Sequence, residues 1–390
     1  MGDAFMDYFL ANGILLEPFG NSGEHGNLLI RNGHIEIVSD GTPPPSAEWI
    51  DCSDCMITSG LIDTHFHANQ FADSLGANAD VVCIPNGVTT AIDAGSCGVS
   101  NIGGLLRFNI PRYTTDVRAL VNVVSSGQLY GTPYEETDDP EYFEVSEICR
   151  LFQEYPDELK GIKIRYHANC TKGFGLRPLQ KTVEIASRVE DMGLKCPVVV
   201  HLGQLEEPLT LQDVLETLRP GDVAAHVFQN SGETLLSREH RVQRCFFEAK
   251  ERGIQFDLAH GRFNFTFENI AQALKEDFCP DMLGSDVGAG NCYIRPAFSL
   301  MSTMTMMYAL GMPLEKIIPA VTATPKEVYD LGTAGKGLKE ELSADLSVFR
   351  LVKGKITFVD RMKEKLTAKE CFMPMMTIKN GKVIYRQSIF

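Results

Sequence analysis

The sequence lacks the features that mark membrane, secreted and nucleic-acid-binding proteins. No apolar run reaches the roughly 18 residues of a membrane span, and the first residues carry Asp3 and Asp7 where a signal peptide is basic. Positively charged residues are also in the minority: the chain has 36 Lys and Arg residues and 51 Asp and Glu residues, which gives a net charge of −15. Such a charge repels phosphate backbones and anionic lipids. We therefore expect a cytoplasmic protein with no nucleic-acid or membrane partner, and a homo-oligomer stays open.

Cysteine is present in number but not in the arrangement of a disulfide framework or a zinc ribbon. The chain has 11 cysteines, an odd number, in a length that needs no disulfide staples. Its one C-x-x-C sequence, from Cys52 to Cys55, has neither a second pair nor a histidine in the same segment. We interpret these residues as reduced, mostly buried thiols, which favours a reducing compartment.

The two ends of the chain predict one small domain that flanks a large one. At 390 residues, the chain exceeds an average domain of roughly 100–200 residues. Residues 28–38 read as two alternating strands around Asn32-Gly33, and residues 376–385 as two more around Asn380-Gly381. We therefore expect a small split β-sandwich domain built from both termini, residues 1–56 and 331–390.

Between these ends, short apolar β-rich runs alternate with amphipathic helical patterns, which predicts an α/β fold with a parallel sheet. The runs end near His65, Asp93, Val124, His167, Gly203, Phe228, Gly261 and Gly288. Eight βα units over residues 57–330 have the size of a TIM-type (β/α)8 barrel. A doubly wound sheet is the competing architecture, but no GxGxxG or P-loop sequence follows the first run.

Histidines and an aspartate stand at the ends of several of these runs. His65 and His67 form an H-x-H whose imidazoles point to one face of a strand, because side chains alternate with a period of two. His201, His226 and Asp286 each follow or end a run that should be buried. Strand ends of a barrel form one rim, so these residues converge on a single site. The pattern predicts a metal centre better than it predicts separate, hydrogen-bonded core histidines.

Lys163 lies within an apolar strand, with Ile162 and Ile164 on the opposite face. An unpaired ammonium group is costly in such a place. The simple interpretation is a salt-bridged or snorkelling lysine. Beside the histidines and Asp286, we favour an N-carboxylated lysine, whose carbamate is an anionic ligand able to bridge two metal ions.

With these residues in place, the chain resembles the amidohydrolase superfamily, and within it the dihydroorotase-like subgroup often labelled dihydroorotase or adenine deaminase. The resemblance rests on the H-x-H after strand one, lysine on strand four, histidines on strands five and six, and aspartate on strand eight. Residues 88–95, 161–165, 201–203 and 256–261 are similar to that subgroup. Some of its members are deacetylases of small acylated carboxylic acids.

The resemblance implies a binuclear site, zinc in most members. His65, His67 and Asp286 would hold one ion, His201 and His226 the other, and Lys163, carboxylated by CO2, would bridge them. A metal-bridging hydroxide would attack an amide or ester carbonyl. Asp286 would take its proton and return it to the leaving group.

The chain departs from the sequence patterns of the enzymes for which the subgroup is named, and these departures bear on the substrate. The dihydroorotase pattern H-x-H-x-R needs an arginine where this chain has Asn69, and mononuclear deaminases use H-x-x-E where His201 is followed by Gln204. We therefore predict a metal-dependent deacetylase of a small N-acyl or O-acyl carboxylic acid. A cyclic amide hydrolase, dihydroorotase-like or hydantoinase-like, is the first alternative. A metal-free, non-catalytic binding protein of the same fold is the second.

Groups that contact the substrate are harder to assign from sequence. A small anionic substrate would need a cation, and guanidinium groups bind carboxylates in a bidentate manner. The candidates are Arg165, Arg262 and Arg295, with His260 as a further polar residue at a strand end. A structural or solvated role is the alternative for each.

Overall fold

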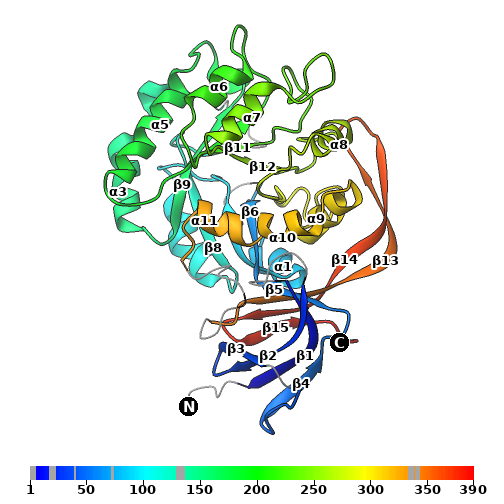
Figure 1. Ribbon diagram of the computed structural model, residues 1–390. Coiled ribbons are helices and arrows are strands. Elements are labelled where there is room, and N and C mark those ends of the chain that lie inside the picture. The colour runs from blue at the N-terminus through cyan, green and yellow to red at the C-terminus, as the bar shows by residue number, and fades with distance from the viewer. Residues whose placement is uncertain are drawn as a thin grey trace.

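The structure is a computed structural model, and it describes residues 6–16, 23–38, 41–71, 74–128, 136, 138–332, 338 and 343–390. Two sheets organise these residues, one a barrel of parallel strands and the other a mixed sheet made from both ends of the chain (Figure 1). The predicted fold, a TIM-type barrel with a split β-domain, is confirmed.

Seven parallel strands form the barrel wall in chain order. They are β6 (Leu61–Phe66), β7 (Val88–Asp93), β8 (Asp116–Asn122), β9 (Leu159–Tyr166), β10 (Val198–Leu202), β11 (Val223–Ala225) and β12 (Gln255–Asp257). Every residue of β6 and β7 is buried, which is typical of parallel strands covered on both faces.

The eighth apolar run closes the barrel without forming a regular strand. It joins its neighbours through isolated parallel bridges, Asp257 to Met282 on one side and Phe66 to Val287 on the other. Between these bridges the backbone of Asp286 is left-handed, with φ of 53°, which a strand cannot accommodate. The eighth run was expected to be a strand, and the conformation of Asp286 is the physical reason that it is interrupted.

Helices surround the barrel and turn their apolar sides toward it. They are α1 (Ala79–Cys83), α2 (Ile102–Gly104), α3 (Val145–Glu154), α4 (Ala168–Thr171), α5 (Arg177–Glu190), α6 (Leu211–Thr217), α7 (Arg244–Glu251), α8 (Phe267–Lys275), α9 (Leu300–Ala309), α10 (Leu314–Ala320) and α11 (Ala323–Val328). The helix α6 begins with a capping box between Thr210 and Asp213.

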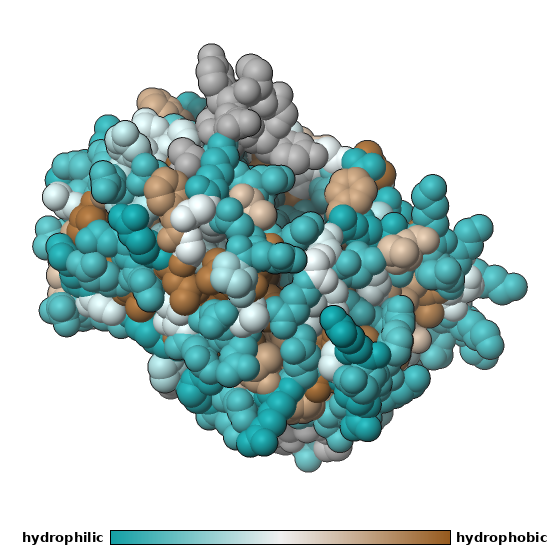
Figure 2. Space-filling model, turned by 90° about the horizontal axis from the view of Figure 1, so that it is seen from above, coloured by the Kyte–Doolittle hydropathy of each residue, from teal (hydrophilic) through white to brown (hydrophobic). Residues whose placement is uncertain are grey.

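From above, the face that includes α5, α6 and α7 is mostly hydrophilic (Figures 1 and 2). No helix among the described residues has the length and apolar character needed to cross a bilayer.

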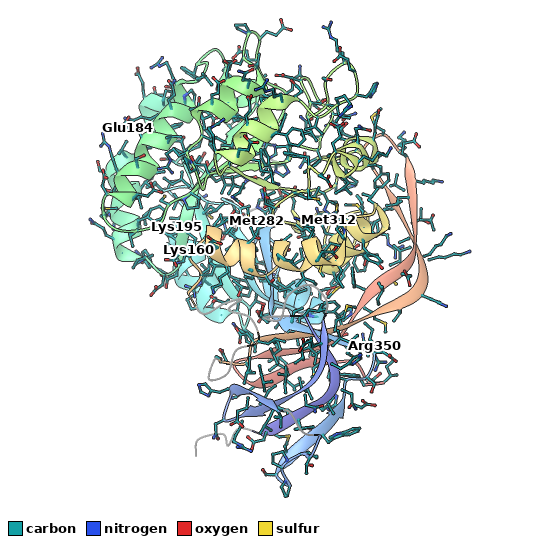
Figure 3. The ribbon with its side chains drawn as sticks, in the orientation of Figure 1. Lys160, Glu184, Lys195, Met282, Met312 and Arg350 are labelled. Carbon is teal, nitrogen blue, oxygen red and sulfur yellow. The ribbon has the colours of Figure 1, made fainter. Side chains whose placement is uncertain are left out.

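The amino-terminal end of the barrel is closed by residues around α11. Val328, Tyr329 and Leu331 pack in one buried cluster with strand residues that include Ile62 and Met282. Figure 3 shows Lys160, Lys195 and Met282, which stand at the starts of their runs, on the same side as α11. The carboxyl ends of the strands are therefore the end left for a site.

The terminal sheet joins strands from both ends of the chain in the order β15-β14-β13-β5-β1-β2-β3, with β4 paired to β1. Its strands are β1 (Asp7–Leu15), β2 (Glu24–Arg31), β3 (His34–Val38), β4 (Ala47–Asp51), β5 (Met56–Ser59), β13 (Leu346–Val359), β14 (Lys365–Lys379) and β15 (Lys382–Arg386). Asn32-Gly33 and Asn380-Gly381 turn the two predicted hairpins with positive φ at all four residues. The 11 cysteines are free thiols.

The hairpin of β13 and β14 extends beyond the terminal sheet and runs along the side of the barrel (Figure 1). It is packed there, because the ring of Phe372 lies 5.5 Å from that of Tyr308 on α9. The backbone N–H of Phe372 also donates to Thr305 Oγ1 at 3.1 Å. The hairpin therefore brings its turn, residues 360–364, to the carboxyl end of the barrel.

Candidate metal centre and active site

A cavity of about 260 Å³ opens at the carboxyl ends of the barrel strands, where several of the predicted site residues lie. His65, His67, His201 and Asp286 line it together with Arg165 and Arg262. These residues come from segments far apart in the sequence. The barrel therefore forms one cavity from residues that sequence analysis could connect only by strand order.

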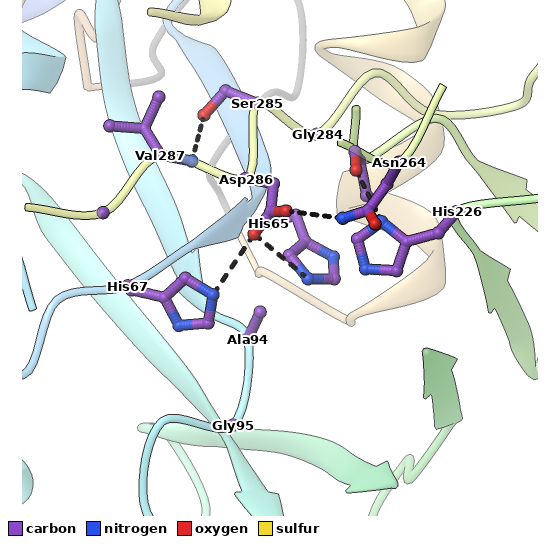
Figure 4. Close-up of polar contacts among 12 residues, drawn as sticks. His65, His67, Ala94, Gly95, His226, Asn264, Gly284, Ser285, Asp286 and Val287 are labelled. Atoms are coloured by element: carbon purple, nitrogen blue, oxygen red, sulfur yellow. Dashed lines mark hydrogen bonds and ion pairs between the residues drawn. The ribbon is translucent and has the colours of Figure 1, made fainter. Parts of the chain in front are cut away.

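His65, His67 and Asp286 form a compact group whose ligand atoms lie within 4.8 Å of one another (Figure 4). His67 Nε2 is 3.3 Å from Asp286 Oδ1, and His65 Nε2 is 3.9 Å from the same oxygen. His65 lies on β6, His67 follows that strand, and Asp286 lies on the interrupted eighth run. The group has the composition and spacing of a candidate metal site.

The other three predicted ligands adjoin this group. Lys163 Nζ is 3.1 Å from His65 Nε2. The ring centroid of His226 lies 4.8 Å from that of His65 and 4.2 Å from that of His201. All six predicted ligands thus lie in one cluster at the same end of the barrel.

The hydrogen bonds of His67 leave it with a nitrogen lone pair facing a carboxylate. Ser96 Oγ donates to Asp93 Oδ2 at 2.8 Å, so His67 Nδ1, 2.8 Å from Ser96 Oγ, is the donor in that contact. In a neutral imidazole, Nε2 then carries the lone pair, and it faces Asp286 Oδ1. Two acceptors that face each other call for a cation between them, and a divalent metal ion meets that need.

His226 presents the same arrangement. Its Nδ1 lies 2.6 Å from the carbonyl oxygen of Ala259 and is therefore the protonated nitrogen. Its Nε2 is buried and has no hydrogen-bond partner among the described residues. Burial lowers the pKa of His226 to about 3, and it also lowers the pKa of His65 and His201 well below the ordinary histidine value. These imidazoles are thus neutral, which is the form that binds metals.

Lys163 is fully buried and has no carboxylate within ion-pair distance among the described residues. Burial lowers the pKa of its amine to about 8, so neutral amine is available near physiological pH. Gly95 makes room for this side chain. It has φ of +77°, and a Cβ atom there would lie 2.4 Å from Lys163 Cβ. The simple interpretation of Lys163 as a salt-bridged residue has no described partner to support it.

Asp286 is more open to the cavity than the two histidines beside it. Its side chain is 18% exposed, against 2% for His65 and 4% for His67. Burial alone would raise its pKa, but the adjoining His67, His226 and Lys163 hold the pKa below its ordinary value. Asn264 Nδ2 donates to Asp286 Oδ2 at 3.2 Å (Figure 4). Asp286 is thus a carboxylate that faces the space where a substrate would bind.

Buried carboxylates behind the ligands were missed by sequence analysis. Asp257 lies 3.9 Å from His65 Nδ1 and accepts hydrogen bonds from Thr64 Oγ1 and the backbone of Gly284. Asp93 supports His67 through Ser96. Both aspartates lie at the ends of apolar strands, and that position was the available signal. Asp93 thus orients the His67 imidazole through Ser96, as supporting groups around metal sites do, whereas Asp257 lies near His65 Nδ1 without a hydrogen bond to it.

Only some of the predicted substrate residues lie at the cavity. Arg165 and Arg262 line the cavity, but Arg165 is paired with Glu136, and Arg262 lies over the ring of Phe263 at 5.2 Å. His260 is not among the lining residues. It is fully buried, with Nε2 3.5 Å from Pro296 O and Nδ1 3.4 Å from Thr303 Oγ1.

Arg295 also lies outside the lining of this cavity. Its guanidinium stands 5.8 Å from the centre of the Phe298 ring, and the residue is exposed. The structure therefore brings two of the four predicted substrate residues, Arg165 and Arg262, to the cavity.

A second cavity of about 280 Å³ adjoins the first, since His201 and Asn264 line both. Gln204, Gln229 and Arg361 also line it. Arg361 belongs to the turn of the β13–β14 hairpin, and sequence analysis gave no sign that this distant segment would reach the site.

Similar proteins were found by sequence and by structure, although no protein-family model matches the chain. A deacetylase of Agrobacterium fabrum is 28% identical over 358 residues, which is 90% of this chain and 85% of the relative. A deacetylase of Brucella anthropi is 27% identical and covers 95% of this chain and 91% of its own. A solved structure described as an adenine deaminase superposes with a TM-score of 0.87 at 26% identity, covering 98% of this chain and 100% of that one.

Proposed function

Because the chain is a member of the amidohydrolase superfamily of hydrolases, we propose that it is a metal-dependent deacetylase of small N-acyl or O-acyl carboxylic acids. Two relatives named deacetylase, aligned over 90% and 95% of the chain, support this reaction class. The observation that carries the proposal is the group in which His65, His67 and Asp286 turn ligand atoms toward one point beside a cavity.

The six clustered residues have the donors for two metal ions. We assign His65, His67 and Asp286 to one ion and His201 and His226 to the other. Lys163, as a carbamate, would be a ligand to both. We expect zinc, because imidazole nitrogen and carboxylate oxygen are ligands that zinc accepts. When bound, such cations lower the pKa of water and polarise a carbonyl group.

Carboxylation of Lys163 needs only its neutral amine and CO2. The amine nitrogen forms a bond to the carbon of CO2 and releases one proton, which converts a neutral buried amine into an anion. A lowered amine pKa favours this reaction because the neutral form is the nucleophile. The resulting carbamate has two oxygens to offer where the unmodified lysine has a single nitrogen.

Asp286 is the residue that we assign to proton transfer. Its carboxylate takes the proton of the attacking water as the water oxygen bonds to the acyl carbon. It then gives that proton to the leaving nitrogen or oxygen as the acyl bond breaks. Asn264 holds Oδ2 of this carboxylate, so Oδ1 is directed toward His65 and His67. The products are acetate and the free amino or hydroxy acid.

Arg262 is the cation, among those predicted from the sequence, that the geometry favours for substrate binding. It lines the cavity with the metal ligands and forms no ion pair among the described residues. Arg165 is neutralised by Glu136 and is better suited to shaping the cavity wall. His260 and Arg295 stay predictions that the lining of the cavity does not support.

A cyclic amide hydrolase is the second candidate, because a solved structure described as a dihydroorotase matches with a TM-score of 0.87. The position two residues beyond His67, where the dihydroorotase pattern has arginine, holds the buried Asn69. Asn69 Oδ1 accepts from Asn109 Nδ2 at 3.1 Å. A neutral, hydrogen-bonded amide in that place favours the deacetylase over ring opening of dihydroorotate.

A substrate panel on metal-loaded protein tests the proposal. N-acetyl and O-acetyl carboxylic acids should release acetate, while hydantoins and dihydroorotate should remain closed. Asp286→Asn should abolish turnover and spare substrate binding, because it removes the proton acceptor but keeps the side-chain shape. Asp277→Asn is the matched control, since Asp277 is exposed and also has a positive φ, 58° against 53°.

Two results would overturn the proposal. Acetate release from none of the acylated acids would exclude the deacetylase. Protein purified without chelator that holds no stoichiometric divalent metal would favour the metal-free binding protein.

A further inference from the structure

The turn of the β13–β14 hairpin is fixed against the barrel by a buried carboxylate. Asp360 is 6% exposed, and its Oδ1 accepts from the backbone N–H groups of Met362 and Glu364 at 2.8 and 2.9 Å. Its Oδ2 accepts from the N–H of Phe267, the first residue of α8, at 2.9 Å. A carboxylate is stabilised at the amino end of a helix. This contact sets the position of the residue that follows Asp360.

That next residue, Arg361, extends over the second cavity. Its Nη1 lies 3.4 Å from the carbonyl oxygen of Phe263, and it lines the cavity with His201 and Asn264. His201 is a proposed metal ligand, and Asn264 contacts Asp286. The C-terminal hairpin thus places a guanidinium at the edge of the candidate active site.

The lining of this second cavity suits an anion. Asn169, Gln204, Gln229 and Ser231 supply neutral polar groups, and no aspartate or glutamate is among the described lining residues. Arg361 has no carboxylate within ion-pair distance in the part of the chain that the structure describes. An unpaired cation beside neutral donors is the arrangement that binds a carboxylate.

We propose that Arg361 binds the carboxylate of the acylated substrate and so sets the specificity for acids over neutral esters and amides. This inference rests on the proposed deacetylase function and names the part of the substrate that the second cavity recognises. The acyl group would lie in the first cavity, near Asp286, and the carboxylate in the second. His201 and Asn264 line the space that joins the two.

The experiment compares an N-acetyl amino acid with its carboxamide, which has nearly the same size and no charge. Arg361→Gln should raise KM for the acid about 10- to 100-fold, the value of a charge-assisted hydrogen-bond pair, with kcat little changed. KM for the carboxamide should not move. Lys363→Gln is the matched control, because it removes one positive charge from the same exposed turn without touching the lining.

The outcomes separate this inference from the proposed function. An equal effect of Arg361→Gln on acid and carboxamide, or no effect on either, would overturn the role of Arg361. If Lys363→Gln raised KM for the acid as much as Arg361→Gln does, the effect would come from the net charge of the turn, and the role of Arg361 would again be overturned. If the wild-type protein hydrolyses no member of the pair, the proposed deacetylase fails. Calorimetric binding of the same two compounds then decides the role of Arg361. That role is rejected if Arg361→Gln prefers the acid over the carboxamide as strongly as the wild type does.

Discussion

Lys163 Nζ lies 3.1 Å from His65 Nε2 in the barrel interior, although 98 residues separate the two in the chain. Both side chains are buried, and neither is joined to a described carboxylate by a side-chain hydrogen bond. An ammonium beside an imidazole has no ion-paired carboxylate among the described residues to balance its charge, whereas a carbamate beside metal-bound histidine would be balanced. The relation between these two residues is therefore the strongest structural reason to test for modification of Lys163.

We predict that Lys163→Ala loses metal and turnover, the latter by more than about a hundredfold, because metal affinity depends on each ligand and its support. Added acetate or propionate should restore part of both, since a short carboxylate fits the space left by the side chain. Metal content by mass spectrometry and turnover are the measurements. Lys160→Ala, on the same strand but partly exposed, is the control.

Wild-type protein supplied with ¹³C-bicarbonate gives a direct check of the modification. A carbamate carbon resonance should appear, and it should be absent from Lys163→Ala. Full metal content in Lys163→Ala, or no carbamate signal in metal-loaded wild-type protein, would show that Lys163 does not bridge.

Gly95→Ala should destabilise the protein by about 1–3 kcal/mol, from backbone strain and overpacking together. A Cβ atom at this position meets Lys163 Cβ at 2.4 Å and would displace the lysine. We therefore also expect reduced metal content. Denaturant unfolding and metal analysis are the measurements.

Gly173→Ala separates the two contributions to that loss. Gly173 has φ of +86°, but an added Cβ would find nothing within 4 Å. The control should show the backbone strain alone and full metal content. If both variants lose the same stability and both keep their metal, the close approach of Gly95 to Lys163 does not contribute to stability or to metal binding.

Features set by local rules were predictable from the sequence. Asn32-Gly33 and Asn380-Gly381 form the expected hairpin turns because these residues accept positive φ at little cost. The clustering of His65, His201 and Asp286 follows from strand order, because all carboxyl ends of a parallel barrel lie on one rim. Local conformation and topology thus carried the fold and the candidate ligand set.

Features set by distant contacts were not predictable in this way. The left-handed backbone of Asp286 interrupts the eighth strand, and it is held by the backbone contact of Asp286 N with His65 O at 2.7 Å. Arg361 reaches the site only because Phe372 packs on Tyr308 and fixes the hairpin along α9. The pairing of Arg165 with Glu136 likewise joins separate βα segments. Such contacts depend on tertiary packing, which periodicity does not encode.

We predict that Asp360→Asn lowers the free energy of unfolding by about 1–2 kcal/mol, as loss of a helix-capping acceptor does. An asparagine can keep one acceptor for Met362 and Glu364, but its NH2 group would face the N–H of Phe267. Because the turn is then less firmly held, KM for an acylated acid should rise less than in Arg361→Gln. Urea unfolding and the KM–kcat comparison are the measurements.

Asp54→Asn is the control for this change, since Asp54 is an exposed aspartate of the terminal domain. Unchanged stability in Asp360→Asn would mean that the carboxylate does not anchor the hairpin. A fall in kcat with unchanged KM would argue against a role in positioning Arg361.

The last prediction concerns Asp138, a fully buried carboxyl group near Arg165. Neither of its oxygens has a hydrogen-bond partner among the described residues. Burial, with the nearby Glu136, raises its pKa from 3.8 to about 8, although Arg165 opposes the change. The folded protein therefore holds a proton on Asp138 that the unfolded chain releases near pH 4.

The sign of the effect on stability follows from this difference in proton binding. A raised pKa in the folded state makes a contribution that is full below about pH 4 and is lost as the pH rises through about 8. Asparagine resembles the protonated acid but does not titrate. Asp138→Asn should therefore equal the wild type at about pH 4 to within about 1 kcal/mol and exceed it at about pH 9.

Urea unfolding of both proteins at a series of pH values measures this effect, and only their difference is used, because other groups titrate in both. A difference of one unit between the pKa of the folded and the unfolded state corresponds to about 1.4 kcal/mol, so the two curves should separate progressively between about pH 4 and about pH 8. Asp139→Asn, at the partly exposed neighbouring residue, should follow the wild type. Parallel curves for Asp138→Asn and the wild type would show that Asp138 is ionised in the folded protein, with partners that compensate its burial.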